Sequence, residues 1–400
     1  MRTPARALCT VAALCALVAA PAAQALAGGL VLEGHARPVT ALGFAPDGSR
    51  IASGSEAGVL RVWDVASGRC LAALRAHRGP VQAVVVSPNG KAIASAGMDN
   101  AVKVWSAASF TCQRSFTPVA RSKTAIEEML ESTDLKTKPG AYALAFSGTT
   151  RYLASGHGDF TSVVWDIKTG AFKRLGGDFK AQAAGKAPSR PVLSVAIASD
   201  ARLAAAGDEQ TSHTDVLGKT TTWATIYLWN PFTAQVAKTI SADSSVLYLA
   251  FLPGDRQLVS AHANGQIAVW DATKGEPVKT LAHGEPLRDA VLAHNGQRLA
   301  STSSSSLRVW DLNTGAVKGF QGGLGADFAA VALSGDGARV AVGGGDAAII
   351  VLEVGKLEDA LVDAQGPAQP QPQPQPGQEP QPGGEQPAPD QQPKEKLWDE

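Results

Sequence analysis

The chain has 400 residues and a balanced charge, with 36 basic and 36 acidic side chains. No overall positive field would attract nucleic acid or an anionic membrane surface, so a nucleic-acid partner is not expected. This length exceeds one ordinary domain, but a repeat fold can use it as a single unit.

The first segment in chain order is a predicted secretory signal. Arg2 and Arg6 precede an apolar stretch over residues 7–20, and small residues follow as far as Ala27. The stretch is too short for an ordinary membrane span, and its flanks are typical of an export signal. We expect a signal peptide over residues 1–27 and a periplasmic or extracellular mature chain without a membrane span. An uncleaved anchor helix is the alternative.

A repeat occupies most of the remaining chain. Six alternating apolar segments end on a tryptophan, and a seventh, degenerate copy ends on Leu352-Glu353. The shorter gaps between tryptophans are about 40 to 42 residues, and turn signals such as Asp47-Gly48 precede each tryptophan by about 15 to 20 residues. Each copy therefore predicts four short antiparallel strands. The six tryptophans, expected to be core residues, are Trp63, Trp105, Trp165, Trp229, Trp270 and Trp310.

Over about residues 30–354 these copies resemble the WD-repeat (Trp-Asp repeat) family in its exported bacterial form. The resemblance implies an all-β fold, a seven-bladed β-propeller of four-stranded antiparallel blades, here over residues 28–357. It also implies a buried hydrogen-bonded set of His, Ser or Thr, Asp and Trp in each blade. The second copy carries the complete set, namely His77, Ser95, Asp99 and Trp105. Incomplete blades are expected to depend more on apolar packing.

The ends of the repeat region predict how the ring closes. Leu30-Val31-Leu32-Glu33 resembles the fourth strand of a copy but precedes the first blade. We expect it to pair with the last blade as its outer strand and so to protect that edge. Residues 358–400, which are rich in Pro and Gln, predict a disordered tail.

Three insertions interrupt the regular period, at residues 118–139, 176–191 and 208–224. Because of their places in the repeat, all three should emerge on one rim, here called the top rim, at blades 3 and 4. Loops on a rigid scaffold often carry binding residues. We expect Trp223 to be an aromatic anchor for a partner, surrounded by the candidate contacts His213, Lys219, Phe179 and Arg190. The alternatives are that the insertions are tolerated surface variation and that Trp223 packs onto the rim.

No catalytic motif, phosphate loop or metal-binding cysteine pair occurs in the sequence, so no catalytic residue, metal or cofactor is predicted. Cys70 and Cys112 are expected to stay unpaired, because equivalent positions on splayed neighbouring blades should be too far apart for a disulfide. The leading hypothesis is a monomeric, non-catalytic scaffold that binds a protein or peptide in the cell envelope. The alternative is a propeller enzyme, a hydrolase or lyase, with its site at the mouth of the central channel.

Overall fold

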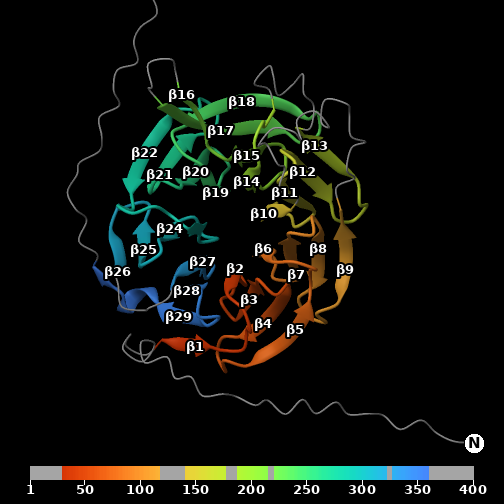
Figure 1. The fold of residues 1–400 in the computed structure, drawn as a ribbon, viewed down its shortest axis with the longest axis vertical. Coiled ribbons are helices and arrows are strands. Elements are labelled where there is room, and N and C mark those ends of the chain that lie inside the picture. Colours follow the sequence, from red (N-terminus) through yellow and green to blue (C-terminus); the bar gives the residue numbers. More distant parts are fainter. Residues whose placement is uncertain (1–28, 118–139, 177–186, 215–219, 322–326, 360–400) are drawn as a thin grey trace, which may run out of the picture. The chain divides into compact units, whose positions relative to one another are not determined.

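The computed structural model describes residues 29–117, 140–176, 187–214, 220–321 and 327–359. These residues form seven antiparallel sheets arranged as blades around a central axis (Figure 1). The predicted seven-bladed propeller is confirmed. The described residues contain no helix long and apolar enough to span a membrane.

In blades 1, 2, 3, 5 and 6 the strands follow one another outward from the axis in chain order. Blade 1 contains β2 (Val39–Phe44), β3 (Arg50–Ser55), β4 (Val59–Asp64) and β5 (Cys70–Arg75). Blade 2 contains β6 (Val81–Val86), β7 (Ala92–Gly97), β8 (Val102–Ser106) and β9 (Cys112–Phe116). Blade 3 contains β10 (Ala141–Phe146), β11 (Tyr152–His157), β12 (Ser162–Asp166) and β13 (Phe172–Leu175). Blade 4 contains β14 (Val192–Ile197), β15 (Ala204–Asp208), β16 (Thr211–Thr214), β17 (Thr220–Asn230) and β18 (Gln235–Ala242).

Blades 5 and 6 follow the same order, whereas the outer strand of blade 7 is β1. Blade 5 contains β19 (Val246–Phe251), β20 (Gln257–His262), β21 (Gln266–Asp271) and β22 (Pro277–Ala282). Blade 6 contains β23 (Asp289–Leu292), β24 (Arg298–Thr302), β25 (Ser306–Asp311) and β26 (Val317–Gln321), and the short β30 (Glu358–Asp359) pairs with β26. Blade 7 contains β27 (Phe328–Leu333), β28 (Arg339–Gly344), β29 (Ile349–Glu353) and β1 (Leu30–Leu32). A 3-10 turn, η1 (Val354–Lys356), follows β29.

The blades hold together through apolar layers between neighbouring sheets. Each third strand sends alternate side chains to opposite faces, so one strand contributes to two such layers. Trp63 of blade 1, for example, packs with Ala341 and Ile349 of blade 7. Tight turns between the first and second strands use glycines with positive φ, such as Gly48 (φ 69°). The result is a continuous ring of buried layers rather than seven separate cores.

The N-terminal strand closes this ring as predicted. β1 pairs antiparallel with β29, with Leu30 opposite Val351 and Leu32 opposite Ile349. Leu32 is fully buried in the layer that contains Trp63 and Val351. The last blade is therefore completed by a segment from the other end of the repeat region, which satisfies the edge of β29.

Candidate functional site

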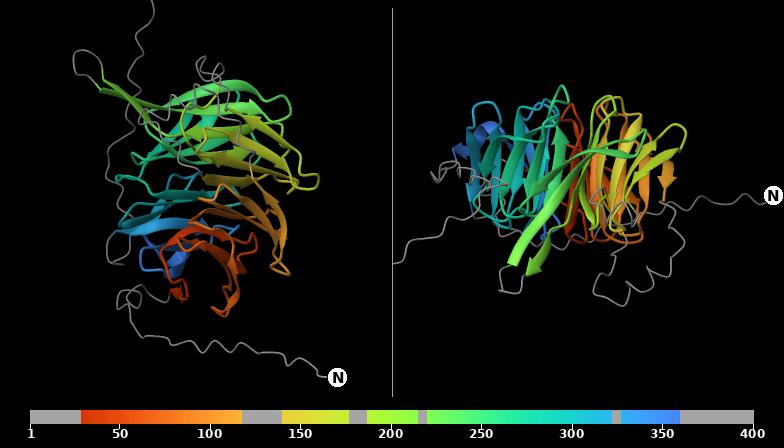
Figure 2. Two further views of the ribbon diagram at one scale, coloured as in Figure 1. Left: turned by 45° about the vertical axis from the view of Figure 1, so that its right-hand side comes forward. Right: turned by 90° about the horizontal axis from the view of Figure 1, so that it is seen from above.

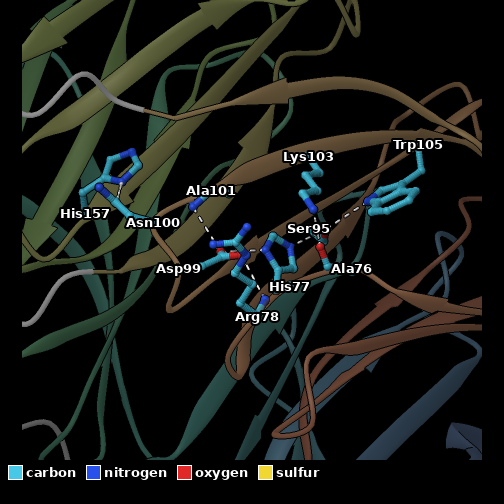
Figure 3. A network of polar contacts seen from close by, with 10 residues as sticks. All are labelled: Ala76, His77, Arg78, Ser95, Asp99, Asn100, Ala101, Lys103, Trp105 and His157. Atoms are coloured by element: carbon cyan, nitrogen blue, oxygen red, sulfur yellow. Dashed lines mark hydrogen bonds and ion pairs between the residues drawn. The ribbon is translucent and has the colours of Figure 1, made fainter.

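The top rim contains the turns between second and third strands and the connections from one blade to the next. In blade 2 these two segments are joined by a buried polar network (Figure 3). Ser95 Oγ accepts a hydrogen bond from Trp105 Nε1 at 3.0 Å, and it lies 2.8 Å from His77 Nε2. His77 Nδ1 lies 2.9 Å from Asp99 Oδ1, and burial lowers the pKa of this imidazole. A neutral histidine that donates to Asp99 satisfies every member of the network.

Blades 3 and 5 build the same network with a histidine from another position. His157 Nε2 lies 2.7 Å from Ser155 Oγ, which accepts from Trp165 Nε1 at 2.8 Å. His262 and Ser260 repeat this arrangement at 2.7 Å. Burial lowers the pKa of His157 to about 4, so the ring is neutral near pH 7. Blades 3 and 5 therefore contain the buried polar network, although we expected incomplete blades to depend more on apolar packing. The Ser-x-His spacing in both copies is the signal that could have indicated it.

Blade 4 has neither the serine nor the histidine. Ala206 takes the place of the serine, because it lies opposite Tyr227 on β17 as Ser95 lies opposite Lys103 on β8. Asp208 ends β15 at the position where His157 ends β11. The buried Nε1 of Trp229 has no hydrogen-bond partner among the described residues. Asp208 is thus not engaged with the tryptophan of its own blade.

A pocket of about 320 Å³ opens beside Asp208 at the top rim. Its floor is one face of the sheet, because alternate residues of β17 share that face with their partners on β18. The connection that enters blade 4 forms the opposite wall, where Arg190 Nη2 donates to Thr211 Oγ1 at 2.8 Å. The lining residues, here called the blade-4 pocket, are Ser189, Arg190, Asp208, Glu209, Thr211, Trp223, Ala224, Thr225, Tyr227, Thr239 and Ser241.

The electrostatics of this pocket are dominated by a buried acid. Asp208 is 4% exposed, and its Oδ1 accepts the backbone N–H of Thr225 at 2.6 Å. Burial raises the pKa of Asp208 to about 7, although the positive charge of Arg190 acts in the opposite direction. Burial and the neighbouring Asp208 raise the pKa of Tyr227 to about 12, so the phenol stays protonated. With the exposed Glu209, the pocket contains two carboxyl groups and one guanidinium.

Next to the pocket, β16 and the first residues of β17 form a hairpin, here called the rim hairpin (residues 211–214 and 220–223). Thr211 pairs with Trp223, and His213 pairs with Thr221. β18 follows β17 only as far as Ala224, so the rim hairpin continues as a two-stranded ribbon beyond the ring (Figure 2).

The structure brings together two of the five candidate partner contacts. Arg190 and Trp223 both line the blade-4 pocket, and Trp223 is 41% exposed. Lys219, Phe179 and the side chain of His213 lie outside the described residues. Sequence reasoning missed Asp208 and Tyr227, which become visible only when blade 4 is set in register with its neighbours.

The central channel, where an enzyme site was the alternative, has a volume of about 560 Å³. Its wall includes Asp289, whose carboxylate accepts the backbone N–H groups of Val331 at 2.9 Å and Ala290 at 2.8 Å. Burial raises the pKa of this carboxyl to about 7. Tyr248 Oη similarly accepts the N–H of Leu292 at 2.8 Å. Both side chains therefore bind backbone groups of the inner strands.

Blade 6 places a serine, a histidine and a carboxylate together, but not in the order of a catalytic triad. His283 Nδ1 and Nε2 each lie 2.8 Å from a serine Oγ, Ser301 and Ser306 respectively. Glu285 accepts from Ser306 at 3.0 Å. In a triad the carboxylate orients the histidine, whereas here both imidazole nitrogens contact serines. Among the described residues, no group of three or more His, Cys, Asp or Glu is placed to hold a metal ion.

Comparison with known proteins identifies the repeats. The family model "WD domain, G-beta repeat" matches residues 29–64, 68–106, 134–166, 234–271 and 275–311. Five segments of the chain are thus similar to WD repeats. The matched segments contain the third strands of blades 1, 2, 3, 5 and 6, and they leave residues 167–233, with most of blade 4, between them. WD-repeat propellers commonly serve as scaffolds for protein interactions and are generally non-catalytic.

One curated protein shows similarity over a short segment. Forty residues of the chain are 48% identical to Periodic tryptophan protein 2 of Saccharomyces cerevisiae. That segment is 10% of this chain and 4% of the yeast protein. The similarity therefore has about the length of one WD repeat.

Proposed function

We propose that this WD-repeat propeller is a non-catalytic, protein-binding scaffold of the cell envelope, which engages its partner through the top rim at blades 3 and 4. The observation that carries the proposal is the rim hairpin, which extends past the ring (Figure 2). Its residue Trp223 lines the blade-4 pocket. In blade 1 the equivalent turn between β3 and β4 contains only residues 56–58.

The physical basis is preorganisation. The ring supplies a rigid base, and hydrogen bonds fix the connection next to the hairpin: Glu209 N donates to Pro191 O at 2.9 Å, and Arg190 donates to Thr211. Residues fixed in this way lose little freedom on binding. Tryptophan is among the residues enriched at the energetic centres of protein interfaces.

The envelope location is supported by the N-terminal sequence pattern, in which Arg2 and Arg6 precede the apolar residues 7–20. These residues lie outside the described part of the chain. Fractionation of cells that express the full chain, with the N-terminus of the recovered protein determined by mass spectrometry, tests this part of the proposal. Recovery from the cytoplasm with residues 1–27 retained would contradict it.

Site-specific photo-cross-linking tests the rim assignment. A photoreactive amino acid at position 223 of the full chain should give a discrete adduct with a partner protein in living cells. The same residue at position 47, in the turn between β2 and β3 on the opposite rim, is the control and should give none. Deleting Ser212–Thr221 should weaken recovery of the partner. An adduct from position 47 alone, with normal recovery by the deletion variant, would show that the wrong rim had been chosen.

A further inference from the structure

Three blades fill one equivalent position with a basic side chain. Arg61, Lys103 and Arg308 lie on the third strands, each opposite the serine that binds the blade's tryptophan. Lys103 Nζ donates to the backbone oxygen of Ala76 in the connection that enters blade 2, and it lies 6.0 Å from the centroid of the Trp105 ring. In blades 1, 2 and 6, the basic side chain therefore lies between the third strand and the connection that enters the blade.

Arg61 shows the same mode of packing in blade 1. Its guanidinium carbon lies 5.7 Å from the centroid of the Trp63 ring. The guanidinium also lies beside Gly34, the residue before His35. The space between the third strand and the entering connection is therefore suited to a long basic side chain, with its stem along the sheet and its charge near the rim.

Blade 4 departs from this arrangement at two adjacent points. Tyr227 stands at the position of the basic residue, opposite Ala206, and contributes no positive charge. Blades 3, 5 and 7 also have uncharged residues at this position, namely Val163, Ala268 and Ile350. Asp208, almost completely buried, stands where blades 3 and 5 have a neutral histidine. Blade 4 therefore has no basic side chain at this position, and it has a carboxyl group where blades 3 and 5 have a histidine. The blade-4 pocket lies over both Tyr227 and Asp208.

We propose that the blade-4 pocket receives a lysine or arginine side chain from the partner protein, in the place that Arg61, Lys103 and Arg308 fill in their own blades. This inference rests on the proposed function, because it names the chemistry that the top-rim surface recognises. The ligand's methylene stem would lie along Trp223, with its charged end directed to Asp208 and Glu209.

The charges of the pocket favour a cation over an anion. Two carboxyl groups face one guanidinium, and that guanidinium already donates to Thr211. The exposed face of Trp223 offers a cation–π contact. The hydroxyl groups of Thr239 and Ser241 on β18 can accept hydrogen bonds from an ammonium or guanidinium group.

Binding should also depend on pH. Because burial raises the pKa of Asp208 to about 7, this carboxyl is largely protonated at pH 6 and largely ionised at pH 8. The other ionisable groups that act on Asp208 or line the pocket with it are Arg190 on the entering connection, Glu209 directly after Asp208, and Tyr227 on β17. A cationic ligand favours the ionised form, so its affinity should be about tenfold higher at pH 8 than at pH 6.

Three blocked pentapeptides provide the test with the full-length chain: acetyl-Gly-Gly-Lys-Gly-Gly-amide, its arginine analogue and its norleucine analogue. Saturation-transfer NMR, which detects weak binding, should show binding of the lysine or arginine peptide and at least tenfold weaker binding of the uncharged norleucine peptide. Equal binding of all three peptides, or binding of none, would overturn the proposal.

Substitutions then locate the binding. Asp208→Asn should weaken binding about tenfold at pH 8 and remove its dependence on pH. Tyr227→Lys should abolish binding by placing a chain-borne ammonium in the pocket. The control Gln297→Lys adds the same charge at an exposed residue in the turn between β23 and β24 on the opposite rim, and it should bind as the wild type does. If Tyr227→Lys does not fold, Asp208→Asn decides the outcome, and unchanged affinity and pH dependence in that variant refute the pocket.

The two proposals can fail separately. If cross-linking at position 223 captures a partner but Asp208→Asn leaves both peptide and partner binding unchanged, the top-rim assignment stands and the basic-side-chain inference is wrong. If position 223 gives no adduct and position 47 does, the proposed interaction surface itself is wrong.

Discussion

Closure of the ring by β1 leads to a quantitative prediction about Leu32. This side chain is 1% exposed and packs against Trp63, Ile349 and Val351. Leu32→Ala removes three carbon atoms from a layer that joins blade 7 to blade 1, and rigid neighbours on both sides limit how far the cavity can collapse. Fully buried leucines cost about 2–5 kcal/mol on truncation to alanine. We expect a loss of about 3 kcal/mol in the free energy of unfolding.

Equilibrium urea unfolding, followed by tryptophan fluorescence, measures this loss. The matched control is Leu71→Ala, because Leu71 also lies on an outer strand, β5, but is 42% exposed. That substitution should cost less than about 1 kcal/mol. If both variants lose the same small amount, β1 does not contribute to stability in the way that its pairing and burial indicate.

Three further predictions concern other parts of the propeller. Cys70 and Cys112 are exposed on β5 and β9 and should remain thiols, so the non-reducing mass of the mature protein should show no loss of two protons. Ser95→Ala should lower the free energy of unfolding by about 1–3 kcal/mol, because Trp105 loses its buried acceptor; a urea curve that matches the wild type would contradict this. The raised pKa of Asp208 means that the folded state holds a proton that the unfolded state releases, so this group's contribution to stability falls as pH rises from about 4 to 7. Relative to the wild type, Asp208→Asn should therefore gain stability by up to about 1.4 kcal/mol per pH unit across this range, measured by urea unfolding at pH 5 and pH 7.

The fold could be predicted from the sequence because the same pattern of strands and turns recurs from copy to copy. One alternating segment that ends on Trp63 is ambiguous, but six such segments with matching turns specify a blade. Ring closure was also predictable, since Leu30-Val31-Leu32 matches the fourth strand of a copy while standing before the first. The short strand β30 was not predictable, because two residues next to a Pro/Gln-rich segment carry no strand pattern.

The candidate site was predictable only in part. Trp223 and Arg190 were identified because they lie in insertions, and the structure places both in one pocket. Asp208 and Tyr227 belong to regular strands, where their importance depends on what faces them across the sheet. Their roles emerge from the register that sets Ala206 opposite Tyr227, and the long insertion after Asp208 hides that register in the sequence.

Blade 4 lacks the serine and histidine of the polar network and contains the pocket, and Ala206→Ser tests whether these two features are linked. A serine at this position would offer Trp229 Nε1 the acceptor that Ser155 gives Trp165, which should raise the free energy of unfolding by about 1 kcal/mol. Because Asp208 lies two residues further along the same face, as His157 does from Ser155, the new hydroxyl should also bind Asp208 and make the carboxyl less available to a ligand. We therefore expect a more stable protein that binds the lysine peptide more weakly.

The matched control is Ala205→Ser, at an equally buried residue on the opposite face. This substitution should destabilise the fold, because no unpaired buried donor lies there to bind the new hydroxyl. A gain in stability from Ala206→Ser with unchanged peptide binding would show that the pocket and the tryptophan network are independent.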